Sequence, residues 1–288
     1  MNRYRATWLG AVLGIVAAFA FTSVAHGESG RFTEEFHHIY PLTAGGRVAL
    51  ENVNGAVHIA AWDRNEVKVD AVKYAGTRER MDEAQIHVDA GADSVSIRTE
   101  YRDRNLTFSD DDPVHNPASV EYTLTVPRSA RLDEIKLING SLDVSGTTGE
   151  VRAQCVNGEV RARSLGGRSE LSTVNGRLDA DFTQLTAPLE LKSVNGNVEL
   201  TIPSNANAEI EASTVNGGIE DNFGMHVRKH RYVGQDVHAQ LGNGGTRIRV
   251  TDVNGRIEVR HADDNQAVAP VRDLNSSRDD DNDDDAEL

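Results

Sequence analysis

The stretch STVNGRLDA at residues 172–180 decides the fold, because close variants of it recur along the chain. CVNGEVRA occupies residues 155–162, SVNGNVEL 193–200 and TVNGGIED 214–221. Val/Ile-Asn-Gly occurs seven times, with Asn at positions 54, 139, 157, 175, 195, 216 and 254. From Asn139 the intervals are 18, 18, 20, 21 and 38 residues, and the last is close to two periods. A fixed period of about 20 residues indicates a solenoid or another repeat array.

Apolar residues flank each Asn-Gly at fixed distances. Four residues before the Asn stand Leu50, Ile135, Ala153, Leu171, Leu191, Ala212 and Val250. Three residues after it stand Val57, Leu142, Val160, Leu178, Val198, Ile219 and Ile257. Charged residues alternate with the apolar ones, which is typical of half-buried strands. Each repeat is therefore predicted to be a strand, an Asn-Gly corner, a second strand and a looser turn.

Two all-β architectures fit this pattern. The first is an elongated β-solenoid of repeats of about 18–21 residues, in which Asn-Gly forms a corner with positive φ. The alternative is an antiparallel β-meander, since Asn-Gly is also the strongest short hairpin signal. The residue before Asn is Val or Ile in all seven copies. A corner can turn both this residue and the Asn inward, where stacked Asn side chains form a hydrogen-bonded ladder. This favours the solenoid.

Residues 120–162 read VEYTLTVPRSARLDEIKLINGSLDVSGTTGEVRAQCVNGEVRA. They resemble the bacterial putative-adhesin family of β-strand (Asn-Gly) repeats, a domain family of unknown function. The family pattern is an alternating strand that ends in Val-Pro, here Val120–Val126 and Pro127, followed by successive Asn-Gly repeats. The resemblance covers roughly residues 40–260 and implies an adhesin-like role without specifying any chemistry. Residues 221–240 lack Asn-Gly, and we expect a loop that bulges from the solenoid there.

The two ends of the chain differ from the repeats. Residues 1–27 have the features of a signal peptide: two arginines, an apolar core and small residues before Glu28. An uncleaved membrane anchor is the alternative, because the apolar run approaches spanning length. Residues 28–265 are predicted to form one β-repeat domain, with a short helical turn within 77–84. Residues 266–288 are predicted to be a disordered acidic tail, since seven of the last ten residues are acidic.

The sequence contains no catalytic motif for hydrolysis or phosphate binding, and we assign no catalytic, cofactor-binding or metal-ligating residue. Cys155 is the only cysteine and is expected to be a small strand residue rather than a reactive thiol. The only histidine cluster is His226, His230 and His238, near Asp221 and Asp236, and its spacing matches no compact metal motif. Whether it binds metal stays open.

An enzymatic function on polysaccharides competes with a binding function. Asp179, Asp181 and Glu190 supply carboxylates, but a solvated strand face also carries such residues. Trp62 is the only tryptophan after the predicted signal peptide, so aromatic platforms for sugars are scarce.

The net charge of −15 argues against a nucleic-acid partner. We expect a non-enzymatic exported protein of the periplasm or cell surface, which presents a scaffold to an envelope protein or glycan. The alternatives are a polysaccharide-acting enzyme and, if the N-terminal segment is retained as an anchor, a membrane-stress signalling component. Membrane contact is expected only in that last case.

The positions free to carry specificity are the outward ones in successive repeats. They are Glu159, Arg161, Arg163, Arg177, Asp179, Asp181, Asn197, Glu199 and Thr201.

Overall fold

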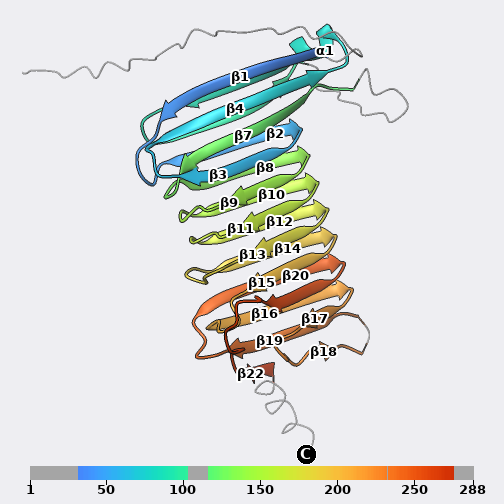
Figure 1. Cartoon of the computed structure of the whole chain (residues 1–288). Coiled ribbons are helices and arrows are strands. Elements are labelled where there is room, and N and C mark those ends of the chain that lie inside the picture. Colours follow the sequence, from blue (N-terminus) through green and yellow to red (C-terminus); the bar gives the residue numbers. More distant parts are fainter. Residues whose placement is uncertain (1–31, 103–115, 232, 276–288) are drawn as a thin grey trace, which may run out of the picture.

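The computed structural model describes residues 32–102, 116–231 and 233–275. The predicted signal peptide and the last thirteen residues of the acidic tail lie outside this part of the chain. Within the described ranges, strands form two long sheets that face each other, and the one helix is α1 (Arg78–Glu83) (Figure 1). No helix there has the length and hydropathy that a membrane span requires. The short helical turn predicted within residues 77–84 is confirmed.

Sheet A contains ten described strands. Their spatial order is β1 (Phe32–Pro41), β4 (Glu66–Ala75), β7 (Ser119–Pro127), β3 (Val57–Trp62), β9 (Leu142–Ser145), β11 (Val160–Arg163), β13 (Leu178–Asp181), β15 (Val198–Ile202), β21 (Ile257–His261) and β17 (Ile219–Asp221).

Sheet B contains twelve described strands. Eleven lie in the order β18 (Arg228–Lys229), β19 (Gln235–Leu241), β16 (Ala208–Asn216), β20 (Thr246–Asn254), β14 (Leu189–Asn195), β12 (Ser169–Asn175), β10 (Val151–Asn157), β8 (Arg131–Asn139), β2 (Arg47–Asn54), β6 (Ser94–Tyr101) and β5 (Ala84–Ala90), and β22 (Val271–Asp273) pairs with β19.

Each repeat is one coil of a solenoid, with its first strand in sheet B and its second in sheet A. The Asn-Gly corner joins the two sheets, as between β10 and β11. Successive coils pair in parallel and in register, so Asn157 lies beside Asn175 and Asn175 beside Asn195. Parallel pairing between repeats excludes a meander of Asn-Gly hairpins for this part of the chain.

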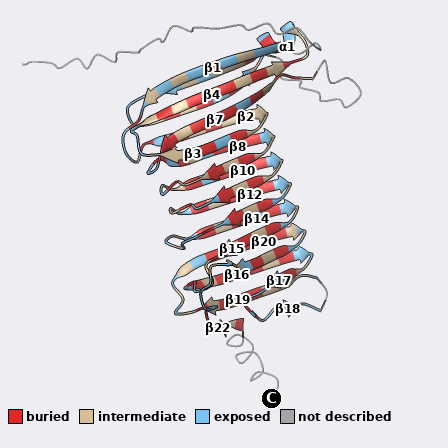
Figure 2. Cartoon of the chain, in the orientation of Figure 1, coloured by how far each residue is buried: buried red, intermediate tan, exposed pale blue. Residues whose placement is uncertain are grey.

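The core lies between the two sheets, along the full length of the solenoid. Figure 2 shows the alternation of buried and exposed positions along the strands. Leu171 and Leu178, on the two sides of one corner, are both fully buried. Because side chains alternate in direction along a strand, apolar residues at every second position of both sheets meet in this interior.

The Asn side chains form a continuous hydrogen-bonded ladder along one edge of the solenoid. The Nδ2 atom of Asn157 donates to Oδ1 of Asn139 at 2.8 Å, and Asn175 donates to Asn157 at 2.9 Å. Asn195 donates to Asn175 in the same way, at 2.9 Å. Each side-chain amide therefore donates a hydrogen bond to the amide of the adjacent coil. The spacing of the ladder is the same as the spacing of the backbone strands.

The predicted inward direction of the Val and Asn side chains is wrong. Val174 and Val194 are each 38 % exposed, and the Asn ladder lies on the outer surface of the corner. The residue before each Val points inward instead: Thr173 is buried and its hydroxyl donates to the Gly158 carbonyl at 3.2 Å. Strand alternation then places the Val outside. The result is an exposed apolar stripe beside the Asn ladder, made of Ile138, Val156, Val174, Val194 and Val215.

The last repeat does not lie at the end of the stack. Its strands β20 and β21 insert between the coil β14–β15 and the coil β16–β17, which precede it in sequence. Asn254 consequently donates to Asn195, and Asn216 donates to Asn254, each at 2.9 Å. The 38-residue interval contains no additional Asn-Gly coil; it contains the segment that closes the C-terminal end.

The loop expected to bulge out at residues 221–240 is in part a strand of the solenoid cap: residues 222–227 lie outside any strand, whereas residues 235–240 belong to β19. Strand β19 pairs antiparallel with β16 along Ala208–Thr214, and β22 pairs antiparallel with β19. Residues 266–275, which the sequence assigned to the disordered tail, therefore include an ordered strand, and Ala269 and Asn275 are buried. These antiparallel strands cover the end of the stack, because β19 pairs with β16 without an Asn-Gly corner and a further coil.

The N-terminal end is also closed by antiparallel pairs. In sheet A, β4 lies between β1 and β7 and pairs antiparallel with both, while β5 pairs antiparallel with β6 in sheet B. The buried Lys73 ties this end together: its Nζ donates to the Ala84 carbonyl at 3.0 Å and lies 3.2 Å from Glu34. A lysine is tolerated in the interior here because its ammonium has both a carbonyl and a carboxylate partner.

An inward and an outward side chain beside the same corner should respond differently to truncation. Leu178→Ala removes a fully buried side chain and should lower the free energy of unfolding by about 2–5 kcal/mol. Arg177→Ala removes an outward side chain and should change it by no more than about 0.5 kcal/mol. Denaturant unfolding of both variants measures the difference, and equal losses would contradict the assignment of faces.

The corner glycine should be irreplaceable because neighbouring corners touch. A Cβ atom on Gly176 would lie 2.0 Å from the Gly158 carbonyl oxygen. Gly176→Ala should therefore destabilise the fold by about 2 kcal/mol or more, since the coil must shift to admit the methyl group. Gly91→Ala is the matched control, because its Cβ would have only one neighbour, at 3.8 Å. Thermal unfolding of the two variants should separate them clearly; similar melting temperatures would contradict the close approach.

Candidate functional site

All nine outward positions singled out in the sequence lie on the outer face of sheet A, on or beside β11, β13 and β15. None of them is buried. Strand pairing sets Arg161, Asp179 and Glu199 side by side in one row across the three coils. The sequence pattern therefore identified a real surface, which we call the sheet A face.

The sheet A face carries a row of carboxylates that flanking arginines neutralise. Beyond Glu199 the row continues through Glu258 and Glu220, so like charges lie on neighbouring strands. Like charges in this arrangement repel. Arg260 offsets the repulsion by contacting Glu199 at 2.8 Å and Glu258 at 2.6 Å, and Arg256 contacts Glu220 at 3.3 Å. The face is a network of exposed ion pairs rather than a concave site.

The outer face of sheet B carries a similar ion-pair network. Arg152 on β10 contacts Asp133 at 3.1 Å and Glu170 at 3.7 Å. Lys192 then links Glu170, at 3.8 Å, to Glu190, at 2.7 Å. The hydrogen bond from Lys192 holds the pKa of the Glu190 carboxyl below its ordinary value. Exposed pairs of this kind contribute little stability each, so an incoming charged partner can replace them at low cost.

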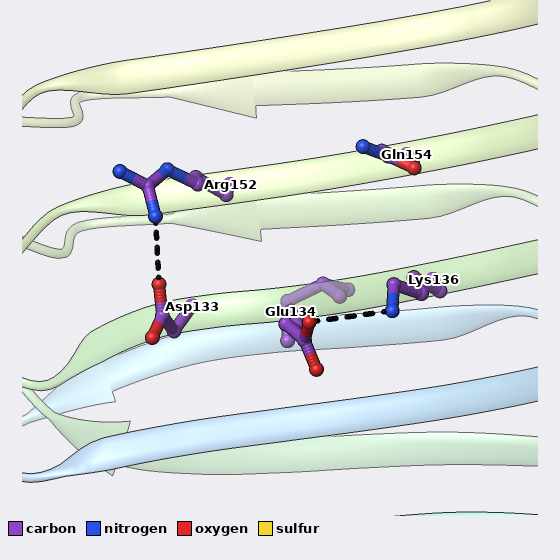
Figure 3. A pocket seen from close by; sticks show the side chains of 6 residues that line it. Asp133, Glu134, Lys136, Arg152 and Gln154 are labelled. Carbon is purple, nitrogen blue, oxygen red and sulfur yellow. Dashed lines mark hydrogen bonds and ion pairs between the residues drawn. The ribbon is translucent and has the colours of Figure 1, made fainter.

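A shallow hollow lies on the sheet B face between β8 and β10 (Figure 3). It has a volume of about 230 Å³ and is lined by Asp133, Glu134, Ile135, Lys136, Arg152 and Gln154. Figure 3 shows Arg152 directed to Asp133 and Lys136 to Glu134. The charged groups thus pair with one another. Small-molecule sites are generally larger and mostly apolar, so this hollow does not have the character of one.

The histidine cluster does not converge in space. His230 contacts Asp236, which also pairs with Arg228 at 3.2 Å, while His238 faces Glu209 on β16 at 3.1 Å. Among the described residues, no group of three His, Cys, Asp or Glu side chains is arranged to hold a metal ion. Asp221 accepts hydrogen bonds from the backbone amides of Gly224 and Met225, so it shapes the turn after β17.

The carboxylates considered for catalysis do not all lie on one face. Asp179 and Asp181 lie on β13 in sheet A, whereas Glu190 lies on β14 in sheet B, on the opposite outer face. Trp62 at the end of β3 is half-buried, and its indole donates to the Glu66 carbonyl at 2.8 Å while Arg64 covers its ring. It does not present an open ring face to a sugar.

Cys155 is a core residue, in agreement with the sequence. It is 2 % exposed, and its thiol donates to the Gly140 carbonyl at 3.2 Å. Burial raises the pKa of this thiol to about 11. The thiolate that reactivity requires is therefore scarce near neutral pH.

Sequence reasoning missed an unusual buried acid, Asp252. It occupies the inward position two residues before the corner Asn, where the other coils have Asn52, Leu137, Cys155, Thr173, Ser193 and Thr214. The side chains of Asn52, Cys155, Thr173 and Ser193 each donate a hydrogen bond to a backbone carbonyl at a corner. An ionised carboxylate has no proton to donate. The alignment of the repeats was the available signal, because only this copy places an acid at that position.

The surroundings of Asp252 favour its neutral form. The residue is fully buried, and neither carboxyl oxygen has a hydrogen-bond partner of good geometry. Ser193 on β14 and Thr214 on β16 lie directly beside it, and no charged residue occupies the paired positions. Burial raises the pKa of Asp252 above its ordinary value, and the two hydroxyls offset only part of the rise.

Comparison with known proteins bears on the coils just described. Residues 130–260 match the family model described as Toastrack DUF4097. The match starts just before β8 and ends within β21, so it contains the regular coils and the inserted one. It supports the resemblance to a domain family of unknown function over this part of the chain. No curated protein sequence matches the chain.

Solved structures offer only distant likenesses. A "putative cell adhesion protein" from Clostridium sporogenes is 14 % identical, with a TM-score of 0.47 over 79 % of this chain and 100 % of that one. A "putative adhesin" from Bacteroides fragilis is 10 % identical, with a TM-score of 0.37 over 79 % and 97 %. A "putative lipid binding protein" from Parabacteroides distasonis is 8 % identical, with a TM-score of 0.25 over 82 % and 98 %. Likenesses at this level carry no conclusion about the function of this chain.

Replacing the buried acid should stabilise the protein at neutral pH. Because the pKa of Asp252 is higher in the folded than in the unfolded state, folding favours the protonated form. Below the unfolded pKa of about 3.8, Asp252 is protonated in both states and does not lower the free energy of unfolding. That free energy falls as the pH rises through the folded pKa, because the buried carboxyl must then ionise. Asp252→Thr supplies the residue found at position 173 and should raise the free energy of unfolding at pH 7 by about 1–3 kcal/mol.

The gain should shrink as the pH approaches 4, which denaturant unfolding of parent and variant across this range measures. Glu190→Gln is the control: its carboxyl has a lowered pKa, so any contribution is present at neutral pH and lost on acidification. A constant difference between Asp252→Thr and the parent at every pH would contradict the assignment.

Proposed function

We propose that this chain is a non-enzymatic, exported cell-envelope protein whose solenoid presents the sheet A face to an envelope protein or glycan, in the manner of an adhesin. The observation that carries the proposal is the row of outward side chains on β11, β13 and β15, which spreads mixed charge over successive coils. A repeat scaffold provides such an extended surface without requiring chemistry at any one point.

The construction of the coil accounts for the recurring apolar pair, the Asn and the Gly of the repeat. The apolar pair fills the core, the Asn forms the ladder and the Gly permits the approach of adjacent corners. Outward positions differ from coil to coil and are the part of the sequence free to encode recognition. The exposed stripe of Val174 and its counterparts, which borders the corner, adds apolar contact area to a mainly polar surface.

The ion pairs of the sheet A face also suit a binding role. Arg177 contacts Glu199, and Arg163 contacts Asp143 at 3.3 Å, with about half of each arginine side chain exposed. Exchange of such pairs for partner charges costs little stability, and each exchange contributes a modest amount of affinity. Specificity then depends on the pattern of charges along the coils rather than on one pocket.

An enzyme acting on envelope polysaccharides is less well supported. Glycoside hydrolysis by the usual mechanism needs two carboxyl groups about 5–10 Å apart on either side of one bond. Asp179 and Glu190 lie on opposite outer faces of the solenoid, so they cannot act together on one bond. Asp179 itself lies in a row of outward charged side chains, between Arg161 and Glu199.

An alanine scan of the sheet A face tests the proposal once in-cell crosslinking has provided a partner. Arg161→Ala, Asp179→Ala and Glu199→Ala should each weaken binding by a few-fold, about 2–10-fold, because each removes one exposed contact. Arg152→Ala on the opposite face is the matched control and should leave the affinity unchanged. Purified partner and variants would be compared by titration calorimetry.

The same variants should be assayed for hydrolase and lyase activity on envelope glycans. We expect no turnover by the parent chain. Glycan turnover that a single carboxylate substitution abolishes would overturn the scaffold proposal and favour the enzyme. Equal loss of affinity on both faces would show that the sheet A face is not the binding surface.

A further inference from the structure

Strand β1 is a long and regular edge. It pairs in unbroken antiparallel register with β4, from Phe32 opposite Ala75 to Pro41 opposite Glu66. On its other side no described strand pairs with it, and Figure 1 shows it as the outermost strand at the N-terminal end of the stack. At the opposite end of sheet A the edge strand β17 has only three residues. Edge strands are usually short, bulged or interrupted by Lys or Pro, because an open edge pairs readily with another strand.

Strand β1 is neither short nor bulged, and helix α1 contacts only its start, where Arg78 lies 5.5 Å from the ring of Phe32. The strand has ten residues, contains no Lys and reaches Pro only at position 41. Its outward side chains include Ile39, which is 54 % exposed, and Thr33, which is also exposed. The strand therefore offers a backbone edge that an additional strand can extend.

The sequence of β1 is self-complementary about its centre. Residues 32–40 read FTEEFHHIY, with Phe36 in the middle. If two copies pair antiparallel with Phe36 opposite Phe36, Glu35 faces His37 and Glu34 faces His38. The outer positions then match Thr33 with Ile39 and Phe32 with Tyr40. Each glutamate thus lies opposite a histidine, and Phe32 lies opposite Tyr40, on both sides of the axis. Glu34 keeps its ion pair with Lys73 at 3.2 Å, so the charge match depends on the outward pair, Glu35 with His37.

The structure keeps these side chains in suitable positions. His37 is exposed and lies beside two carboxylates, Asp70 on β4 at 2.8 Å and Glu35 at 3.3 Å. Its hydrogen bonds to Asp70 and then Glu35 raise the pKa of His37, which increases its positive charge near neutral pH. On the inner side of the strand, the ring of His38 lies between Phe36 and Tyr40, with centroid distances of 4.8 and 5.9 Å.

We propose that β1 pairs antiparallel with β1 of a second copy of this chain, about a twofold axis at Phe36, so that sheet A runs on from one solenoid into the other. A twofold interface requires a surface that is complementary to itself, and the exchange of Glu for His about the centre of β1 meets that requirement. An unrelated extended peptide would gain the same backbone hydrogen bonds but would not account for the symmetry of the charges.

The predicted dimer is reversible and end-to-end. A single strand pair is smaller than a standard protein–protein interface, so the dimer should dissociate on dilution. It doubles the length of the sheet A face without covering it, because β1 lies beyond the coils that carry that face. The inference stands independently of the proposed function, since no envelope partner takes part in it.

Charge reversal at one matched pair tests the interface. The chain from residue 28 on, which contains every described strand, should show a concentration-dependent dimer in sedimentation equilibrium. His37→Glu places an acid opposite Glu35 at two symmetric points, and Glu35→Lys places a lysine opposite His37. Each variant alone should dimerise about tenfold or more weakly, since like charges on facing strands repel. An equimolar mixture should recover the affinity, because the introduced glutamate then faces the introduced lysine, while the unchanged Glu35 of one copy faces the unchanged His37 of the other.

Glu121→Lys is the matched control, an exposed charge reversal on β7, two strands inside the edge. It should dimerise like the parent. A parent chain that sediments as a monomer at every concentration, or a mixture that fails to recover, would overturn the proposal. Recovery by mixing also shows that both variants are folded.

Cross-linking tests the register without altering the core. Thr33→Cys in one copy lies opposite Ile39→Cys in the other, whereas two Thr33→Cys chains place their thiols six residues apart along the strands. A disulfide should therefore form efficiently only in a mixture of the two variants, and the buried Cys155 takes no part. Equal cross-linking of Thr33→Cys alone would overturn the twofold register at Phe36.

Discussion

The contact of one glycine corner with the next sets the geometry of the whole solenoid. At each regular corner the backbone of one coil passes so close to the preceding one that a Cβ on Gly158 or Gly196 would lie 1.9 Å from a glycine carbonyl oxygen. Only glycine allows this approach, and the approach brings successive strands to hydrogen-bonding distance in both sheets. The Asn ladder then fixes the corners in register on the outside, because each Nδ2 donates to the Oδ1 of the preceding coil.

The same corner explains the buried donors in the interior, and it also explains why Asp252 is an unusual residue there. Glycine carbonyls that point into the solenoid need donors, and buried hydroxyl, thiol or amide groups supply them, as Thr173 does for Gly158. Asp252 can supply a proton only when it is neutral. The coil that carries it is also the one inserted out of sequence order between β14 and β16. The least well satisfied interior position therefore lies in the least regular part of the stack.

The outer surfaces follow from what the coil leaves free. In the regular coils the inward positions are committed to the core and the corner, so most charged side chains lie on the two outer faces, where pairs such as Arg260 with Glu199 balance them locally. The hollow beside Arg152 on the sheet B face is lined by charged groups that pair with one another. These properties suit a partner that extends over several coils. The unprotected edge at β1 provides a separate surface, whose complementarity lies in the backbone and in the symmetry of its sequence.

The sequence by itself determined the coil. A period of about 20 residues, apolar residues at fixed distances from each Asn and the Gly after it predict repeated pairs of strands with Leu171 and Leu178 inside, because these features depend only on local alternation and on the corner. The sequence left parallel coils and antiparallel hairpins both open, and the pairing of the strands decides for parallel coils. It also located the outward side chains of β11, β13 and β15, since alternation fixes both faces at once. That part of the fold and of the candidate surface could be predicted without any structure.

The tertiary structure decided what depends on contacts between distant segments. The direction of Val174 was wrong in the sequence analysis because the strand alternation that buries Leu171 and Thr173 continues up to the corner and places Val174 outside. An interval of 38 residues is compatible with a skipped coil or with a cap, and only the pairing of β20 between β14 and β16 distinguishes them. Asp252 becomes a buried acid, and β1 an open edge, only when the order of the strands is known. Periodicity specifies each coil, whereas the position of a coil in the stack depends on long-range pairing that leaves no periodic signal.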